Sequence, residues 1–401
     1  MGKPKALLLE NIHPDAAASL ARAGFSVALR PQAASEGELR RLLSGVSLLG
    51  VRSRTRVSGS ALRRAKDLLA VGAYCVGTGN VDLAAAADRG VAVFNAPFSN
   101  TRSVAELVAG EIVMLMRGVF DKSRRLHEGL WQKSAGGAHE LRGKRLGIIG
   151  YGNIGGQAGL LAEALGMKVV YYDLVERLAL GNAQPCSSQA ELLRQADVVT
   201  LHVDDRPRNA GLIGEKELGA MRRGALLINA SRGKVVDLKA LARALRRGRL
   251  AGAAIDVFPE EPAADGQGFQ CPLQGLPNVI LTPHVGGSTV EAQRNIAAYV
   301  SEKLADYARL GDTFYSVNLP QVQLPVLRKC HRLLHIHRNV PGVMSQINTI
   351  LASHGINITG QYLETNDRVG YAITDIARSY DKGVIKSLEA IAETIRLRVL
   401  F

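Results

Sequence analysis

Along most of the chain, short runs of apolar residues alternate with longer amphipathic segments. The runs before residue 95 predict strands at 5–9, 26–29, 48–51, 70–73 and 91–94, with a helix over 14–23 after the first of them. Short strands alternating with helices are typical of βαβ units, whose strands pair in parallel. The pattern therefore predicts a doubly wound parallel sheet in this part of the chain.

A second series of apolar runs begins after a long apolar helix predicted over 103–117. Its strands are predicted at 145–149, 168–172, 198–202, 225–229, 253–256 and 279–282. These runs are apolar throughout rather than alternating, as strands covered on both faces should be. We expect a second doubly wound sheet here, so that the two sheets are Rossmann-like or flavodoxin-like.

The end of the chain follows a different pattern. A helix is predicted from residue 286 to about 307, and Pro320 and Pro325 then mark an extended linker. Strands are predicted at 333–337, 356–364, 370–377 and 396–401, with helices at 342–353 and 382–391. This βαββαβ order predicts a small ferredoxin-like domain.

The composition supports a globular protein with several domains. The 401 residues are 47% hydrophobic and 21% charged, which excludes a disordered chain, and they are too many for one core. No apolar run approaches the roughly 18 residues of a membrane span, and the first residues lack the apolar segment of a signal peptide. The four cysteines lie far apart without metal-ligand spacing. We expect a cytoplasmic protein with no membrane partner, no metal and reduced thiols.

The net charge of +14 is compatible with nucleic acid or with an anionic metabolite as ligand. The basic residues occur as scattered pairs rather than as a tail or a basic-aromatic stripe. We therefore expect no nucleic-acid partner.

A glycine-rich turn follows the predicted strand 145–149 and opens an apolar helix. It reads Gly150-Tyr151-Gly152-Asn153-Ile154-Gly155, and Asp173 stands at the end of the next strand. The glycines permit a tight turn and a close approach of the backbone to a pyrophosphate, and the acid can accept hydrogen bonds from the adenosine ribose. The sequence predicts a dinucleotide site, with NAD favoured over NADP, although Arg177 is close enough in sequence to weaken that preference.

Polar residues gather where three predicted strands of the second sheet end. Arg232, Glu261 and His284 lie in the segments 229–233, 256–262 and 282–287. Carboxyl ends of parallel strands meet at one edge, where ligands bind. A histidine can exchange a proton with an alcohol near neutral pH, a carboxylate can orient it, and a guanidinium can bind a carboxylate bidentately. This set suits the oxidation of a 2-hydroxy acid.

A further basic cluster, Arg52-Ser53-Arg54, stands at the end of a predicted strand of the first sheet. Asn100 lies at the interdomain crossing, and Lys133 lies beside Trp131. A phosphate dianion needs more positive charge than a plain hydroxy acid, and these groups would supply it. A second glycine cluster, 77–80, has no ribose acid at the proper spacing and reads as a turn.

The terminal domain carries Asn339-Val340-Pro341-Gly342, which closes a strand and opens a helix. Exposed amide nitrogens there suit a carboxylate, and Asn side chains could hold an amino acid. The histidine pair at 335 and 337 suggests zinc only weakly, because no acid or thiol lies nearby in sequence.

These motifs resemble the D-2-hydroxyacid dehydrogenase family, and within it the bacterial phosphoglycerate dehydrogenase group that carries a regulatory ACT domain. The resemblance covers nearly the whole chain, including the segments 51–55, 98–106, 150–155, 231–233, 256–262 and 282–287. It implies Arg232, Glu261 and His284 as catalytic residues, with His284 as general acid/base. It implies NAD contacts from Gly150, Gly152, Asn153, Ile154, Gly155, Asp173, Ala230, Ser231, Asp256, Gly286 and Gly287.

The resemblance also implies a substrate, an effector and a domain plan. The substrate is 3-phospho-D-glycerate, oxidised to 3-phosphohydroxypyruvate, with its phosphate end at Arg52, Ser53, Arg54, Asn100 and Lys133; 2-oxoglutarate is a possible side substrate. Serine would bind at His337, Asn339, Gly342 and Asn357 of the ACT domain and inhibit. Residues 1–98 and 286–318 would form a discontinuous substrate domain, 99–285 the NAD domain, 319–330 a linker and 331–401 the ACT domain.

Edge strands of ACT domains commonly pair between subunits, so a homo-oligomer, a tetramer, is expected. One departure is the linker, which reads Leu327-Arg328-Lys329 where relatives often have Gly-Gly, and this puts the strength of serine inhibition in question. Two alternatives stay open. One is a glycerate or hydroxypyruvate reductase, and the other is an NADH-sensing corepressor of the same fold, which the positive charge would suit.

Overall fold

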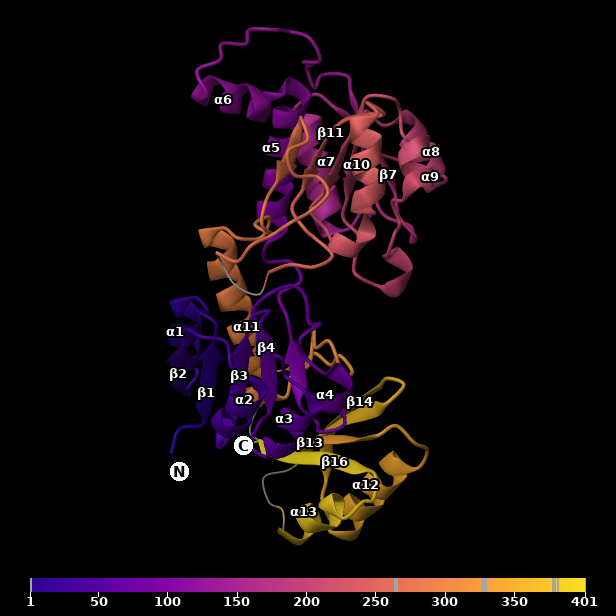
Figure 1. Cartoon of the computed structure of the whole chain (residues 1–401). Helices are drawn as coiled ribbons and strands as arrows, with labels where there is room; N and C mark the ends of the chain where they lie inside the picture. The colour runs from indigo at the N-terminus through magenta and orange to yellow at the C-terminus, as the bar shows by residue number, and fades with distance from the viewer. Residues whose placement is uncertain (1, 263–265, 326–329, 377–379, 381, 401) are drawn as a thin grey trace. The chain divides into compact units, whose positions relative to one another are not determined.

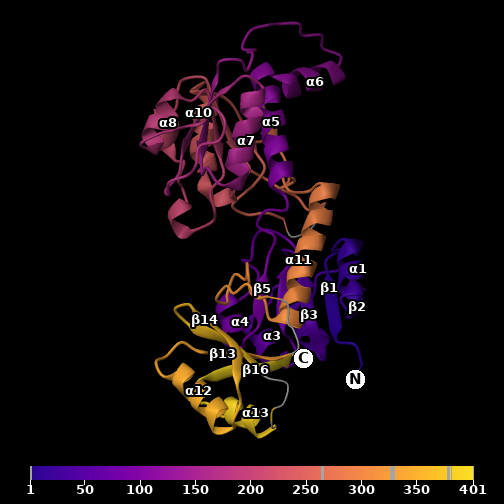
Figure 2. The same cartoon turned by 180° about the vertical axis from the view of Figure 1, so that it is seen from behind.

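The computed structural model describes residues 2–262, 266–325, 330–376, 380 and 382–400. The chain forms two compact units. The first takes in the chain up to Ser99 and again from Gln293 onward, and the second is Asn100–Ala292. Figures 1 and 2 show the elements of both from opposite sides.

The first unit contains a five-stranded parallel sheet in the order β2-β1-β3-β4-β5. Its strands are β1 (Lys5–Leu9), β2 (Ser26–Arg30), β3 (Val46–Val51), β4 (Ala70–Ala73) and β5 (Ala92–Phe94). This is the flavodoxin-like order, in which the chain direction across the sheet reverses between β1 and β3. Loops at the carboxyl ends of β1 and β3 therefore border the crevice where such sheets bind ligands.

Helices cover both faces of this sheet. On one face, α1 (Pro14–Arg22) and the long α11 (Val290–Leu310) share a core through Leu20, Val300 and Leu304. Figure 2 shows α11 running beside α1. The other face is covered by α2 (Glu36–Leu42), α3 (Gly59–Arg64) and α4 (Leu83–Ala87).

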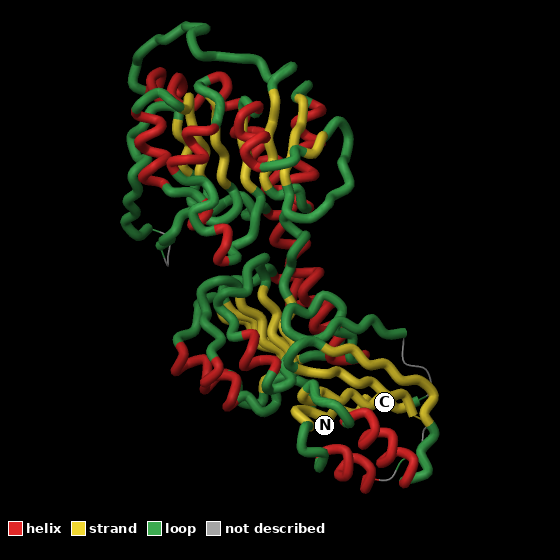
Figure 3. The backbone as a smooth tube through the Cα atoms, turned by 90° about the vertical axis from the view of Figure 1, so that its right-hand side faces the viewer, coloured by secondary structure: helices red, strands yellow, loops and turns green. Residues whose placement is uncertain are grey.

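The C-terminal part of the first unit is an antiparallel sheet in the order β14-β15-β13-β16. Its elements are β13 (His331–Arg338), α12 (Val343–Ser353), β14 (Ile358–Thr365), β15 (Val369–Ile376), α13 (Lys382–Glu389) and β16 (Thr394–Leu400). Both helices cover one face (Figure 3), while Leu334, Ile336 and Tyr371 on the other face join the core around α11. The predicted βαββαβ order is confirmed. Residues 377 and 401 of two predicted strands and residues 326–329 of the predicted linker lie outside the described residues.

The second unit contains a seven-stranded parallel sheet in the order β12-β11-β10-β9-β6-β7-β8. The strands are β6 (Arg145–Ile149), β7 (Lys168–Tyr172), β8 (Gln184–Pro185), β9 (Val198–Leu201), β10 (Ala225–Asn229), β11 (Leu250–Ile255) and β12 (Val279–Leu281). This is the Rossmann order, with its reversal between β6 and β9.

Two cores lie on the two faces of the seven-stranded sheet. One packs α5 (Thr101–Arg117) and α7 (Asn153–Ala164) against the sheet. The other contains α8 (Gln189–Gln195), α9 (Glu215–Ala220) and α10 (Leu238–Arg246). The predicted α/β fold class is thus confirmed. Helix α6 (Val119–His127) was not predicted, and none of its residues is buried.

Candidate active site

The three predicted catalytic residues lie together in the second unit. Arg232 follows β10, Glu261 follows β11 and His284 follows β12, and these three strands are neighbours in the sheet. All three residues therefore stand at the carboxyl edge, as expected from the segments that carry them.

His284 and Glu261 form a direct pair. His284 Nδ1 donates to Glu261 Oε2 at 2.8 Å, and Glu261 Oε1 accepts the Phe258 amide at 3.1 Å. The backbone of His284 is left-handed, with φ 54°, and its amide donates to the carbonyl of Asp256 at 2.8 Å. Since a non-glycine residue rarely adopts this conformation, the loop must be held by its surroundings.

The pair shifts both pKa values in opposite directions. The hydrogen bond that His284 donates to Glu261 raises the pKa of His284, although partial burial opposes this shift. Burial alone would raise the pKa of Glu261, but the bonds from His284 and the Phe258 amide lower it. The hydrogen bond at Nδ1 leaves Nε2 of His284 as the nitrogen that can exchange a proton with a substrate.

Arg232 is held beside this pair by its own loop. Asn229 Nδ2 donates to the Arg232 carbonyl at 3.1 Å, and Asn229 Oδ1 accepts the Ser231 amide at 3.1 Å. At Gly233, a Cβ would collide with the backbone of Phe258, so the two loops touch closely. The guanidinium lowers the pKa of both His284 and Glu261, which places a positive charge within electrostatic reach of each. Asn229 was not among the predicted site residues, although it begins one of the three segments.

Asp256 organises the histidine loop. Its Oδ1 accepts Thr282 Oγ1 at 2.6 Å and the Val285 amide at 2.8 Å, while Oδ2 accepts the Gly286 amide at 2.8 Å. The side chain is buried. Asp256 therefore holds the chain on both sides of His284.

A second buried carboxyl group lies near Asp256. Glu111 on α5 is 1% exposed, and neither carboxyl oxygen has a hydrogen-bond partner among the described residues. Burial, together with the charge of Asp256, raises the pKa of Glu111 to about 8. Sequence reasoning missed this residue because it lies inside a continuous apolar helix.

The glycine turn after β6 fits a dinucleotide. Gly150 has φ 91°, and a Cβ there would lie 2.6 Å from the His202 carbonyl oxygen, while a Cβ at Gly155 would meet the Gly150 carbonyl. Nothing lies within 4 Å of the Cβ position of Gly152, which is the N-cap of α7. The turn is therefore closed toward the protein and open at the helix N-terminus, where a pyrophosphate binds. Asn153 and Ile154 form the first turn of that helix.

Asp173 stands directly after β7, as predicted. Its Oδ2 accepts the Tyr151 amide at 2.9 Å, which ties it to the glycine turn. Arg177 Nε lies 3.4 Å from the same oxygen, so the arginine whose place in the sequence weakened the prediction of NAD over NADP forms an ion pair with Asp173. A carboxylate at this position remains able to accept ribose hydroxyls.

The other predicted cofactor residues lie close to the catalytic loops. Ala230 and buried Ser231 connect β10 to Arg232. At Gly286 a Cβ would come within 2.9 Å of Asp256 Oδ2, and at Gly287 it would collide with the Asn100 side chain. These two positions accept no side chain without movement of their neighbours.

The predicted substrate residues are divided between the units. Arg52, Ser53 and Arg54 belong to the first unit and follow β3. Asn100 belongs to the second, as the N-cap of α5, and its buried Oδ1 has no hydrogen-bond partner among the described residues. Lys133 is exposed on the segment after α6.

The four predicted effector residues all lie in the C-terminal βαββαβ part. Buried His337 contacts the Arg338 carbonyl through Nδ1 at 2.8 Å, and Asn339 Nδ2 donates to the Asn366 carbonyl at 2.8 Å. Gly342, with φ 90°, is the N-cap of α12, and Asn357 is exposed just before β14. Nowhere in the described ranges do three or more His, Cys, Asp or Glu side chains group as metal ligands would.

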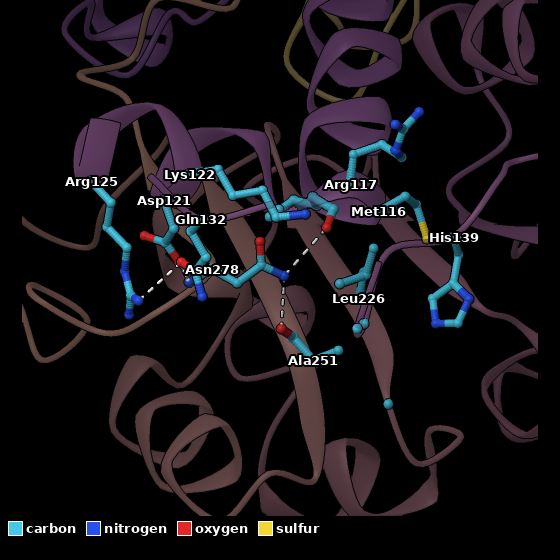
Figure 4. A pocket seen from close by; sticks show the side chains of 15 residues that line it. Met116, Arg117, Asp121, Lys122, Arg125, Gln132, His139, Leu226, Ala251 and Asn278 are labelled. Atoms are coloured by element: carbon cyan, nitrogen blue, oxygen red, sulfur yellow. Dashed lines mark hydrogen bonds between the residues drawn. The ribbon is translucent and has the colours of Figure 1, made fainter. Parts of the chain in front are cut away.

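A cavity of about 390 Å³ lies at the opposite edge of the second sheet (Figure 4). It is lined at the amino ends of β10 and β11 by Leu226 and Ala251, and Asn278 donates to the Ala251 carbonyl there at 2.8 Å. This cavity is therefore separate from the loops that carry Arg232, Glu261 and His284.

Of the helices that the structure describes, none is long and apolar enough to span a membrane.

Comparison with known proteins decides the family. The chain is 48% identical over 402 residues to D-3-phosphoglycerate dehydrogenase of Escherichia coli (strain K12), covering 100% of this chain and 98% of that protein. It is 43% identical to D-3-phosphoglycerate dehydrogenase 1 of Saccharomyces cerevisiae, covering 100% of this chain and 88% of that protein. The chain belongs to the D-isomer specific 2-hydroxyacid dehydrogenase family.

Two family models match separate parts of this dehydrogenase. The NAD-binding domain of D-isomer specific 2-hydroxyacid dehydrogenases matches residues 109–286, and an AHAS small subunit-like ACT domain matches 333–396. The structure resembles D-lactate dehydrogenase from Aquifex aeolicus in complex with NAD and lactic acid, with TM-score 0.64 and 27% identity, covering 76% of this chain and 95% of that one. The expectations of an NAD-dependent dehydrogenase and of an ACT domain are confirmed.

Proposed function

We propose that this dehydrogenase oxidises 3-phospho-D-glycerate to 3-phosphohydroxypyruvate with NAD, the first step of phosphorylated serine biosynthesis. The observation that carries the chemistry is the His284–Glu261 pair at 2.8 Å beside Arg232. The names of the similar proteins support the choice of substrate.

Each catalytic side chain has a distinct role in this reaction. NAD held at the glycine turn of Gly150, Gly152 and Gly155 would supply the acceptor for the hydride that leaves C2 of the substrate. His284 takes the proton of the C2 hydroxyl at Nε2, Glu261 holds the imidazole by its other nitrogen, and Arg232 binds the substrate carboxylate. In the reverse direction, protonated His284 gives its Nε2 proton to the C2 carbonyl oxygen, which becomes the hydroxyl.

The phosphate end of the substrate is proposed to bind Arg52, Ser53 and Arg54, with Asn100 and Lys133. Among the described residues no carboxylate forms an ion pair with Arg52 or Arg54. Two unpaired guanidinium groups match a phosphate dianion. In this proposal residues 1–98 with 286–318 form the substrate domain, 99–285 the NAD domain, 319–330 the linker and 331–401 the ACT domain.

His284→Ala tests the proposed proton role. Turnover should fall roughly 10²–10⁴-fold, because a general acid/base contributes about that much, while NADH binding followed by fluorescence should persist. His354→Ala, which changes an exposed histidine after α12, is the matched control and should keep normal turnover. Near-normal turnover of His284→Ala would refute the role.

Substrate choice is tested with a panel of three acids. The proposal expects a higher kcat/KM for 3-phosphoglycerate than for D-glycerate, while the reverse order would favour a glycerate or hydroxypyruvate reductase. Reduction of 2-oxoglutarate is the expected side activity.

Serine is proposed as an inhibitor that binds the ACT domain at His337, Asn339, Gly342 and Asn357. The ACT match over 333–396 supports a ligand-binding regulatory role. Titration calorimetry should show heat on adding L-serine; the absence of heat would exclude this effector.

The proposal also includes the assembly and the location of the protein, which we expect to form a homotetramer in the cytoplasm. Large apolar side chains are exposed on α6 and the segment after it, where a partner subunit would cover them: Val119, Phe120, Leu126, Leu130 and Trp131. Figure 1 shows α6 and this segment extending away from the seven-stranded sheet. Light scattering that gives the mass of a monomer would contradict this part of the proposal.

A further inference from the structure

The loop that carries Arg52 and Arg54 is fixed to the protein through its backbone. It leaves β3 at the carboxyl edge of the five-stranded sheet, next to the reversal of strand order between β1 and β3. This is where such sheets bind their ligands. The residues that hold this loop lie in the segments that follow β1 and β4, the two strands that flank β3.

Glu10 holds the loop from the side of β1. It directly follows that strand and is 1% exposed. Its Oε2 accepts the Arg54 amide at 2.9 Å, and its Oε1 accepts the Thr55 amide at 2.7 Å. Both carboxylate oxygens are thus bonded to the backbone of a loop more than forty residues away.

The backbone at Glu10 shows that this contact is imposed by the fold. Glu10 and the next residue, Asn11, both have left-handed φ values, 63° and 50°. This conformation is uncommon for residues other than glycine and persists where the surrounding structure holds it. The turn after β1 therefore brings the carboxylate under the loop at some conformational cost.

Asn80 holds the same loop from the side of β4. Its Nδ2 donates to the Arg52 carbonyl at 3.0 Å and to the Thr55 carbonyl at 2.8 Å. Asn80 ends the second glycine cluster, 77–80, for which the sequence indicated only a turn. Two backbone amides and two backbone carbonyls of the loop are therefore bonded to side chains from the segments after β1 and β4.

We propose that Glu10 and Asn80 are positioning residues that set the substrate's phosphoryl selectivity by fixing the Arg52–Thr55 loop. The inference rests on the proposed function, which assigns these arginines to the phosphate. Because Glu10 bonds to backbone amides, the loop is ordered without an ion pair between that carboxylate and either guanidinium. Both positive charges then remain available to a dianionic ligand.

The test measures selectivity rather than activity alone. The ratio of kcat/KM for 3-phosphohydroxypyruvate to that for hydroxypyruvate is measured from NADH oxidation. Glu10→Gln puts an amide donor against a backbone N–H and should lower this ratio about tenfold, mainly through KM of the phosphorylated substrate. Glu38→Gln is the matched control, since Glu38 also accepts a backbone amide, that of Ser35 at 3.1 Å, but at the start of α2.

Combined variants show whether Glu10 acts through the arginines. Replacing Arg52 and Arg54 by alanine should also lower the ratio, and adding Glu10→Gln to that variant should lower it no further. Asn80→Ala should lower the ratio as Glu10→Gln does. If Glu10→Gln does not fold, Asn80→Ala serves as the test variant in its place.

The outcomes separate the two hypotheses. If the arginine variant lowers the ratio and neither Glu10→Gln nor Asn80→Ala does, the positioning inference is wrong and the proposed function stands. A further loss in the combined variant also overturns the inference, because Glu10 would then act elsewhere. If the arginine variant leaves the ratio unchanged, the phosphate assignment fails, and the inference fails with it.

Discussion

Replacing Glu261 by glutamine separates the orienting role of the carboxylate from its charge. The 2.8 Å bond to His284 Nδ1 is charge-assisted, and such bonds contribute about 1.5–3 kcal/mol. The side chains of His284 and Glu261 are 53% and 35% exposed, so solvent screening favours the lower end, about 1.5 kcal/mol. Glu261→Gln should therefore lower kcat about tenfold.

The direction in which the pH profile of the same variant moves follows from the His284–Glu261 pair. Oxidation needs neutral His284, so kcat/KM rises as pH passes upward through its pKa, which Glu261 raises. Without the carboxylate that pKa falls, and the rise should move to lower pH. Reduction needs protonated His284, so its decline with increasing pH should also move to lower pH.

The assay is the initial rate of NADH formation or consumption over a series of pH values in both directions. Glu260→Gln, a substitution at the neighbouring exposed glutamate, serves as the control and should leave both profiles unchanged. Profiles that stay in place for Glu261→Gln, or move to higher pH, would refute the role assigned to the pair.

Two other carboxyl groups give independent predictions. Asp173→Ala should raise KM for NAD roughly tenfold and narrow the gap to NADP, because a charge-assisted bond to the ribose is lost; unchanged kinetics with both cofactors would contradict this. Glu111 has its pKa raised from 4.5 to about 8, so the unfolded state loses this proton first. As pH rises from 4.5 to about 8, the free energy of unfolding should fall by about 1.4 kcal/mol per pH unit. Glu111→Gln should abolish this pH dependence, as measured by urea unfolding. If the free energy of unfolding varied with pH in the same way in the wild type and in Glu111→Gln, the buried protonated carboxyl group would be excluded as the cause.

Local patterns were sufficient for the elements and for the main motifs. The apolar runs at 5–9, 145–149 and 225–229 match the observed strands residue for residue, because a parallel strand covered on both faces is a nearly continuous apolar run. The glycine turn and Asp173 were predictable for a similar reason, since a tight turn and a ribose acid must lie at fixed distances from a strand end. Helix α6 was not predicted, and its apolar side chains Val119, Phe120 and Leu126 are exposed rather than part of a core.

The sequence by itself determined the fold class, the dinucleotide turn and the edge of the sheet where Arg232, Glu261 and His284 stand. Only the tertiary structure decided which side chains hold those groups in place. Asp256 binds a loop about thirty residues away and Glu10 one more than forty away, and Glu111 is isolated inside an apolar helix. Periodicity reports which face of a strand or helix is buried, whereas a hydrogen bond between distant loops depends on how the chain brings them together, and no local pattern records that.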